Sequence, residues 1–90
     1  MMRGIITVLG KDSVGIIGRI CTYLAEEGIN ILDISQTIVG GYFNMMMIVD
    51  LSESTHKFEN VSTGLKSIGD ELGLEVKLQR EDIFDSMHRI

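Results

Sequence analysis

The chain has 90 residues, a hydrophobic content of 44%, a single cysteine and a formal net charge of −5 at pH 7. This length fits one domain, the acidic balance with scattered basic residues argues against nucleic acid as a partner, and one cysteine excludes an internal disulfide. Neither a leader sequence nor a run of about 20 apolar residues is visible, so we expect a cytoplasmic protein that does not cross a membrane.

The first half of the chain reads as strand, loop, helix and strand. Residues 5–9 are apolar and rich in β-branched side chains, which predicts a strand that is apolar on both faces. Asp12 and Ser13 are both good helix N-caps, and the apolar residues after them recur at helical spacing as far as Gly28, which is suited to end a helix. Residues 29–39 then alternate between apolar and polar, as in a strand at the edge of a sheet.

The second half begins with the clearest local signal, a hairpin turn. Gly40 and Gly41 can adopt the positive φ angles of a tight turn, and residues 42–49 then form a nearly continuous apolar run. A strand that is apolar on both faces needs cover on both. We therefore expect helices on one side of this strand and a second copy of the chain on the other.

Two more regular elements and a short extension complete the predicted fold. Apolar residues between 58 and 72 step by three and four, which predicts an amphipathic helix, and residues 74–79 alternate as a half-exposed strand does. Residues 81–90 carry a further apolar face, which predicts a short C-terminal helix. The order predicts an α+β, ferredoxin-like βαββαβ domain over residues 1–80, with a four-stranded antiparallel sheet, two helices on one face and an amphipathic extension over 81–90.

Three stretches of the sequence resemble the ACT domain family, whose members are small regulatory modules that bind amino acids. These are the strand of residues 5–10, the loop Lys11–Ile17 with Asp12 three residues before Gly15, and the Gly-Ile-Asn-Ile sequence of residues 28–31. The family usually has proline before that glycine, where this chain has Val14, and proline there presets the start of a helix. The likeness spans residues 3–80, and the chain is also similar to a subgroup of stand-alone proteins of bacteria and archaea.

The resemblance implies an amino-acid site where the first loop enters the helix. The backbone N–H groups of Val14, Gly15 and Ile16 would take the carboxylate, because a helix start attracts anions. The side chain of Asp12, which Ser13 follows, would take the ammonium group. The alternative from the residues alone is that Asp12 only caps the helix.

The doubly apolar strand over residues 42–49 and the apolar extension over 83–90 predict a homodimer, and we expect the site to lie near the second strand of the partner chain. Asn30 and Ile31 at the start of that strand would then approach the ligand. Asn30 is equally well explained as an ordinary polar residue of an edge strand.

Other site chemistries find little support in the sequence. The glycines of the first loop have neither the dinucleotide nor the P-loop spacing, and His56, His88 and Cys21 are too few for a zinc site. We therefore predict a non-catalytic regulatory module without cofactor or metal, which binds a free amino acid and serves a metabolic enzyme or regulator. The alternative is a protein-interaction module with no small ligand.

Overall fold

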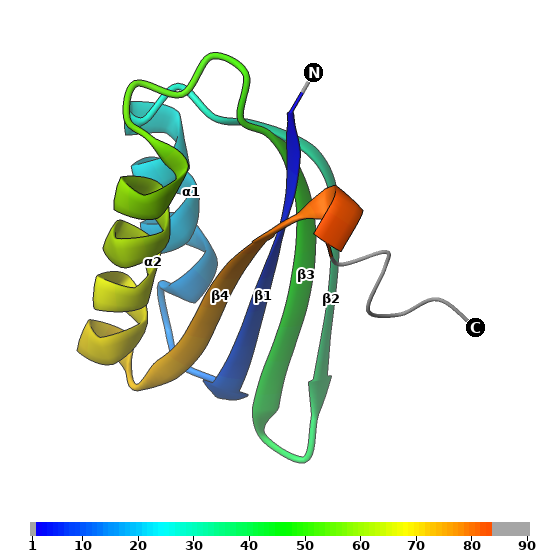
Figure 1. Cartoon of the computed structure of the whole chain (residues 1–90). Helices are drawn as coiled ribbons and strands as arrows, with labels where there is room; N and C mark the ends of the chain where they lie inside the picture. The colour runs from blue at the N-terminus through cyan, green and yellow to red at the C-terminus, as the bar shows by residue number, and fades with distance from the viewer. Residues whose placement is uncertain (1, 84–90) are drawn as a thin grey trace.

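Four strands and two helices make up the computed structural model, which describes residues 2–83. In chain order the elements are β1 Arg3–Lys11, α1 Ile16–Glu26, β2 Asn30–Val39, β3 Tyr42–Asp50, α2 Phe58–Leu72 and β4 Leu74–Arg80. The sheet is antiparallel in the order β2-β3-β1-β4, and both helices cover one of its faces (Figure 1). This confirms the predicted ferredoxin-like fold. Residues 81–83 add a helical turn, and the rest of the expected C-terminal segment lies outside the described residues.

The hydrophobic core lies between the helices and the face of the sheet that they cover. Strands β1, β3 and β4 send alternate side chains into it, whereas β2 contributes only the partly buried Ile31. The fully buried large side chains are Ile6, Val8, Ile20, Leu24, Met45, Met47, Val49, Val61 and Leu65. Neither α1 nor α2 covers the opposite face of the sheet, here called the outer face (Figure 1). There Tyr42 and Met46 of β3 remain 56% and 42% exposed in the single chain.

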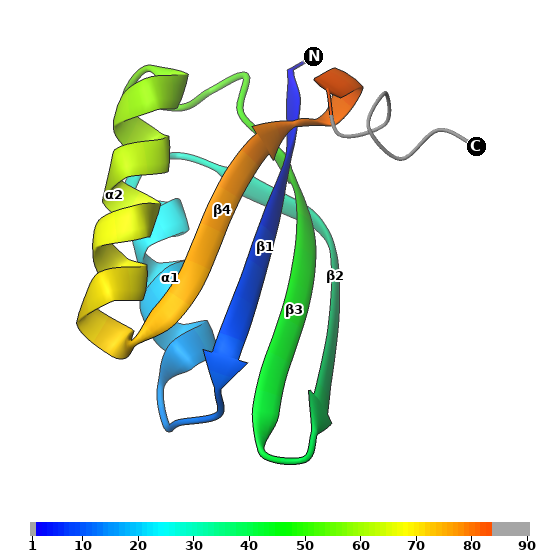
Figure 2. The same cartoon turned by 60° about the horizontal axis from the view of Figure 1, so that its bottom comes forward.

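The β2–β3 hairpin forms at the predicted turn. Gly40 and Gly41 have φ angles of 58° and 83°, a region that side chains with a Cβ atom rarely adopt. Because α1 crosses over the sheet between β1 and β2, these two strands point the same way. Their carboxyl ends therefore lie at one end of the sheet, where the β1–α1 loop comes beside the hairpin (Figure 2).

Two glycines bring α2 close to its neighbours. At Gly64 the helix meets the side chain of Tyr23 on α1, and at Gly69 it meets β4 near Leu74 and Val76. A Cβ atom at either position would collide with these neighbours. This close packing is a reason for glycine at interior helix positions that the sequence pattern does not explain, since glycine costs about 1 kcal/mol relative to alanine there.

Candidate functional site

The loop between β1 and α1 is fixed at both ends by backbone hydrogen bonds. The N–H group of Asp12 donates to the carbonyl oxygen of Gly41 at 3.0 Å, which ties the loop to the hairpin. At the other end Gly15 has a left-handed φ of 89°, and its carbonyl oxygen accepts the first helical bond from Arg19 at 2.9 Å. The conformation of Gly15 thus sets the direction in which the chain enters α1.

The start of α1 corrects the capping prediction. The N-cap residue is Gly15, and no side chain makes a hydrogen bond to the cap, so the expectation that Asp12 or Ser13 caps the helix was wrong. The reason is that the turn at Gly15 moves the helix start to Ile16, beyond the reach of those side chains. The N–H groups of the first helical turn have no intrahelical partners, so they remain open to an external acceptor.

A shallow groove of about 230 Å³ lies beside this helix start. It is lined by Asp12, Ser13, Gly15, Ile16, Ile17, Gly18, Gln36, Ile38 and Phe43. Four of the predicted site residues therefore come together in one place. Val14, also predicted, points away and is fully exposed at the tip of the loop. Within residues 2–83, the side chain of Asp12 makes no hydrogen bond or ion pair, which leaves its carboxylate available to a ligand.

Gln36 and Ile38 are groove residues that the sequence reasoning did not select. They lie near the carboxyl end of β2, which the βαβ crossover places beside the carboxyl end of β1. The predicted topology carried this information, because two parallel strands joined by a helix end at the same edge of a sheet. The sequence reasoning selected β2 residues from the family likeness alone, so it named the start of the strand and not its end.

Asn30 and Ile31 lie at the other end of β2. Asn30 is opposite Asp50 and Ile31 opposite Val49, whereas the groove is near the end where Val39 faces Tyr42. Neither residue lines the groove of its own chain. Their predicted part in the site therefore depends on a second copy of the chain.

The strand β2 forms one edge of the sheet. In the part of the chain that the structure describes, it pairs only with β3, and nine of its ten residues are exposed. Ile34 and Ile38 share the side of the sheet on which the helices lie, yet they are 42% and 59% exposed because the helices do not extend over this edge (Figure 1). The groove beside Asp12 is thus open along an edge that carries apolar side chains.

Residues 2–83 lack two other kinds of functional element. No three His, Cys, Asp or Glu side chains in this part of the chain are grouped so that they could hold a metal ion. None of its helices is long and apolar enough to span a membrane.

Comparison with known proteins places this chain in a family. A sequence profile described as the ACT domain matches residues 4–79. A UPF0237 protein of Bifidobacterium longum is 53% identical over 90 residues, which cover the whole of both chains. Full coverage of such a relative agrees with the predicted likeness to stand-alone proteins.

Solved structures give the same assignment. An ACT domain protein from Streptococcus pneumoniae superposes with a TM-score of 0.81 at 38% identity, over 93% of this chain and 94% of that one. The ligand-free regulatory subunit of aspartate kinase from Thermus thermophilus has a TM-score of 0.66 at 25% identity, over 87% of this chain and 50% of that one. The chain therefore belongs to the ACT domain family of regulatory, ligand-binding modules.

Proposed function

We propose that this protein is a non-catalytic sensor that binds a free amino acid beside the start of α1 and acts as a homodimer. The observation that carries the proposal is an uncapped helix start next to an unpaired carboxylate in one groove. The first-turn N–H groups suit the carboxylate of an amino acid, and Asp12 suits its ammonium group. The apolar lining from Ile17, Ile38 and Phe43 suits contact with the ligand's side chain.

The proposed dimer pairs the exposed β2 strands of two copies. In such an antiparallel pair the start of one strand lies beside the end of the other, so Asn30 and Ile31 of one copy approach the groove of its partner. The exposed Ile34 and Ile38 support this choice of edge, because pairing would cover apolar area that contributes about 25 cal/mol per Å². Each groove would then be completed by the partner chain, and the bound state would signal to a metabolic enzyme or regulator.

The test is a thermal-shift titration of the intact protein with each common amino acid, with the molecular mass followed by sedimentation. A ligand at a hundred times its dissociation constant stabilises the folded form by about 2.7 kcal/mol. In a domain of this size that raises the melting temperature by about 10 °C or more.

Asp12→Asn is the variant that locates the site. It removes the charge with little change of shape, and a hydrogen bond to a charged group contributes about 1.5–3 kcal/mol, so affinity should fall about tenfold to a hundredfold. Stability without ligand should stay the same, because no described contact of Asp12's side chain is lost. Glu26→Gln is the matched control, since it also removes one negative charge from an exposed side chain, on α1 and away from both the groove and β2.

The outcomes separate function from site. If no amino acid shifts the melting curve, the sensing function is refuted, and a module that only contacts other proteins replaces it. If an amino acid binds but Asp12→Asn keeps its affinity, the function stands and the groove is the wrong site.

A further inference from the structure

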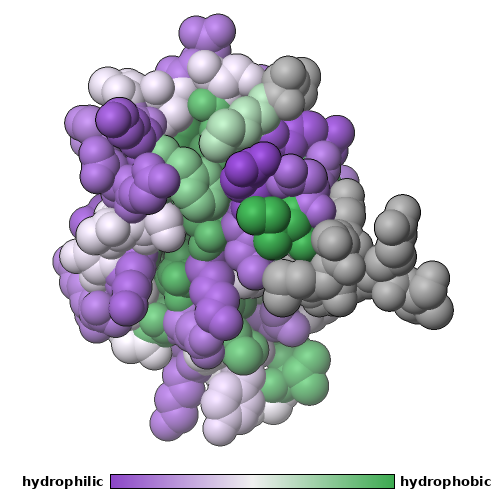
Figure 3. Space-filling view, viewed as in Figure 1, coloured by the Kyte–Doolittle hydropathy of each residue, from purple (hydrophilic) through white to green (hydrophobic). Residues whose placement is uncertain are grey.

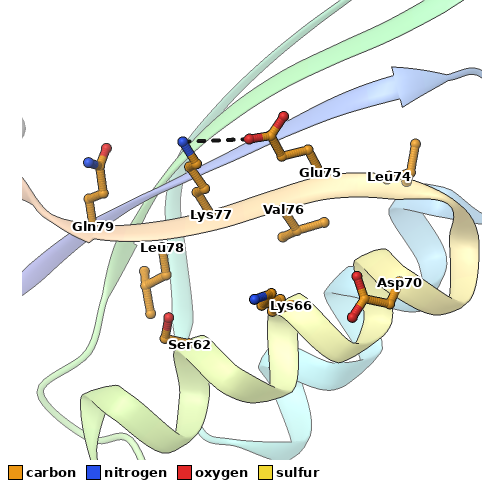
Figure 4. Close-up of a pocket in the computed structure, with 9 residues that line it drawn as sticks. All are labelled: Ser62, Lys66, Asp70, Leu74, Glu75, Val76, Lys77, Leu78 and Gln79. Atoms are coloured by element: carbon orange, nitrogen blue, oxygen red, sulfur yellow. Dashed lines mark ion pairs between the residues drawn. The ribbon is translucent and has the colours of Figure 1, made fainter.

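A second groove lies on the far side of the molecule, along the free edge of β4. It has a volume of about 460 Å³ and runs between β4 and α2 (Figure 4). It is lined by Ser62, Lys66, Asp70, Leu74, Glu75, Val76, Lys77, Leu78 and Gln79. Figure 3 shows apolar surface between the hydrophilic residues of α2 and those of β4. Among residues 2–83, β4 pairs only with β1, so its other edge can accept a further strand.

The charges on β4 follow a pattern that fits a second copy of the same strand. Glu75 and Lys77 both point to the outer face, where they form an ion pair at 3.5 Å (Figure 4) but remain 64% and 65% exposed, so each can also meet a charge on a second copy. Val76 between them points toward α2. If two β4 strands pair antiparallel about a two-fold axis through Val76, residue 75 of each copy lies directly opposite residue 77 of the other. The pairing then places opposite charges together twice, and it places Leu74 opposite Leu78.

The helix side of the groove repeats this complementarity. Lys66 and Asp70 on α2 lie on either side of Val76 along the strand direction (Figure 4). The same two-fold axis therefore brings Lys66 of one copy toward Asp70 of the other. Neither side chain forms an ion pair with another residue in the range 2–83, so both are available for a partner.

We propose that β4 is a second self-association edge, at which two copies of the chain pair antiparallel about Val76. Charged residues on an edge strand commonly prevent pairing. On β4 the order of negative and positive residues has the opposite effect. Self-pairing places each charged residue beside one of opposite charge, both between the two β4 strands and between the two α2 helices. The interface is isologous, so a single substitution changes two symmetry-related contacts at once. It is separate from the proposed β2 contact, which uses the other edge of the sheet.

Charge reversal tests the register directly. Glu75→Lys gives a chain with Lys at both positions, and Lys77→Glu gives a chain with Glu at both, so each variant alone should repel its own copy. Opposite-charge and like-charge cross-strand pairs differ in free energy, and each variant changes two such pairs. The dissociation constant for pairing through β4 should therefore rise about tenfold or more in each single variant. An equimolar mixture of the two variants should associate again, because every cross-strand pair is then opposite in sign. The double variant Glu75→Lys/Lys77→Glu should also associate.

The readout is molecular mass by sedimentation across a concentration series, with circular dichroism to show that each variant is folded. Glu26→Lys on α1 is the control, because it makes the same charge change away from β4. Pairing through β2 adds the same mass in every variant, since none of the substitutions lies on that strand. A mass that is unchanged by the single reversals overturns the proposal. So does a mixture that stays as dissociated as its components, and in either case the charges on β4 act to protect an unpaired edge.

Discussion

Replacing Gly69 with alanine should destabilise the protein, although alanine is the better helix former. A Cβ atom on Gly69 would lie 2.7 Å from the carbonyl oxygen of Leu74 and 2.9 Å from Cγ2 of Val76. The oxygen belongs to the backbone of β4, so it cannot move aside without shifting the strand. Overpacking of this kind costs about 1–3 kcal/mol, against about 1 kcal/mol gained in helix propensity. We expect a net loss of unfolding free energy of up to about 2 kcal/mol.

Gly18→Ala is the matched comparison, since it makes the same change inside α1. A Cβ atom there meets nothing within 4 Å, so only the propensity gain of about 1 kcal/mol remains. Gly64→Ala should fall between the two, because its nearest neighbours are atoms at the end of the Tyr23 side chain, which can swing outward.

Thermal and urea unfolding of the three variants without ligand would measure these differences. Each kcal/mol shifts the melting temperature of a domain this size by about 4–8 °C, so Gly18→Ala should melt at least about 4 °C above Gly69→Ala. If Gly69→Ala is as stable as Gly18→Ala, the close contact between α2 and β4 does not exist, and the reasoning fails.

Two pH-dependent predictions follow from shifted pKa values. Burial, followed by the negative charge of Glu27, raises the pKa of Tyr23 above its ordinary 10.0. The folded state therefore favours the neutral phenol, and this preference stabilises the fold. The stabilisation is fully present below about pH 10 and is lost as the pH rises through the pKa that Tyr23 has in the folded protein. Absorbance titration should show this raised pKa and a lower one in Glu27→Gln, and an unchanged value in that variant would contradict the contribution of Glu27. At Asp50, hydrogen bonds from the side chain and backbone of Ser52 lower the pKa of the carboxyl group below its ordinary 3.8. The charged carboxylate therefore stabilises the folded state above that pH, and this stabilisation is lost as the pH falls through the pKa that Asp50 has in the folded protein. Ser52→Ala should raise the pKa of Asp50 in an NMR titration, and no change would show that the hydroxyl has no effect.

The features that sequence predicted well are those that neighbouring residues determine. Gly40 and Gly41 gave the hairpin because their positive φ angles are a local requirement. The alternation in β2 and β4 gave two edge strands, and the nearly continuous apolar run of β3 gave a central one. Element order then selected the fold, because few topologies accommodate this sequence of strands and helices.

The features that sequence missed depend on contacts between distant residues. Asp12 and Ser13 are good caps by residue type, but the turn at Gly15 places them outside the helix start. The contact between Tyr23 and Gly64 joins two helices, and periodicity within either helix does not report it. Gln36 was missed for a different reason, since the predicted topology already placed its end of β2 beside the loop.

The open side of the groove beside Asp12 links two equilibria. If the partner's β2 completes this groove, as proposed, the amino acid and the second chain bind to the same assembly. Thermodynamic reciprocity then requires that the ligand tightens the dimer by the same factor by which dimerisation tightens the ligand. A rise in metabolite concentration would therefore act as a rise in effective protein concentration. A downstream partner would then respond to the fraction of chains that are dimeric. This response requires no change of fold inside either chain.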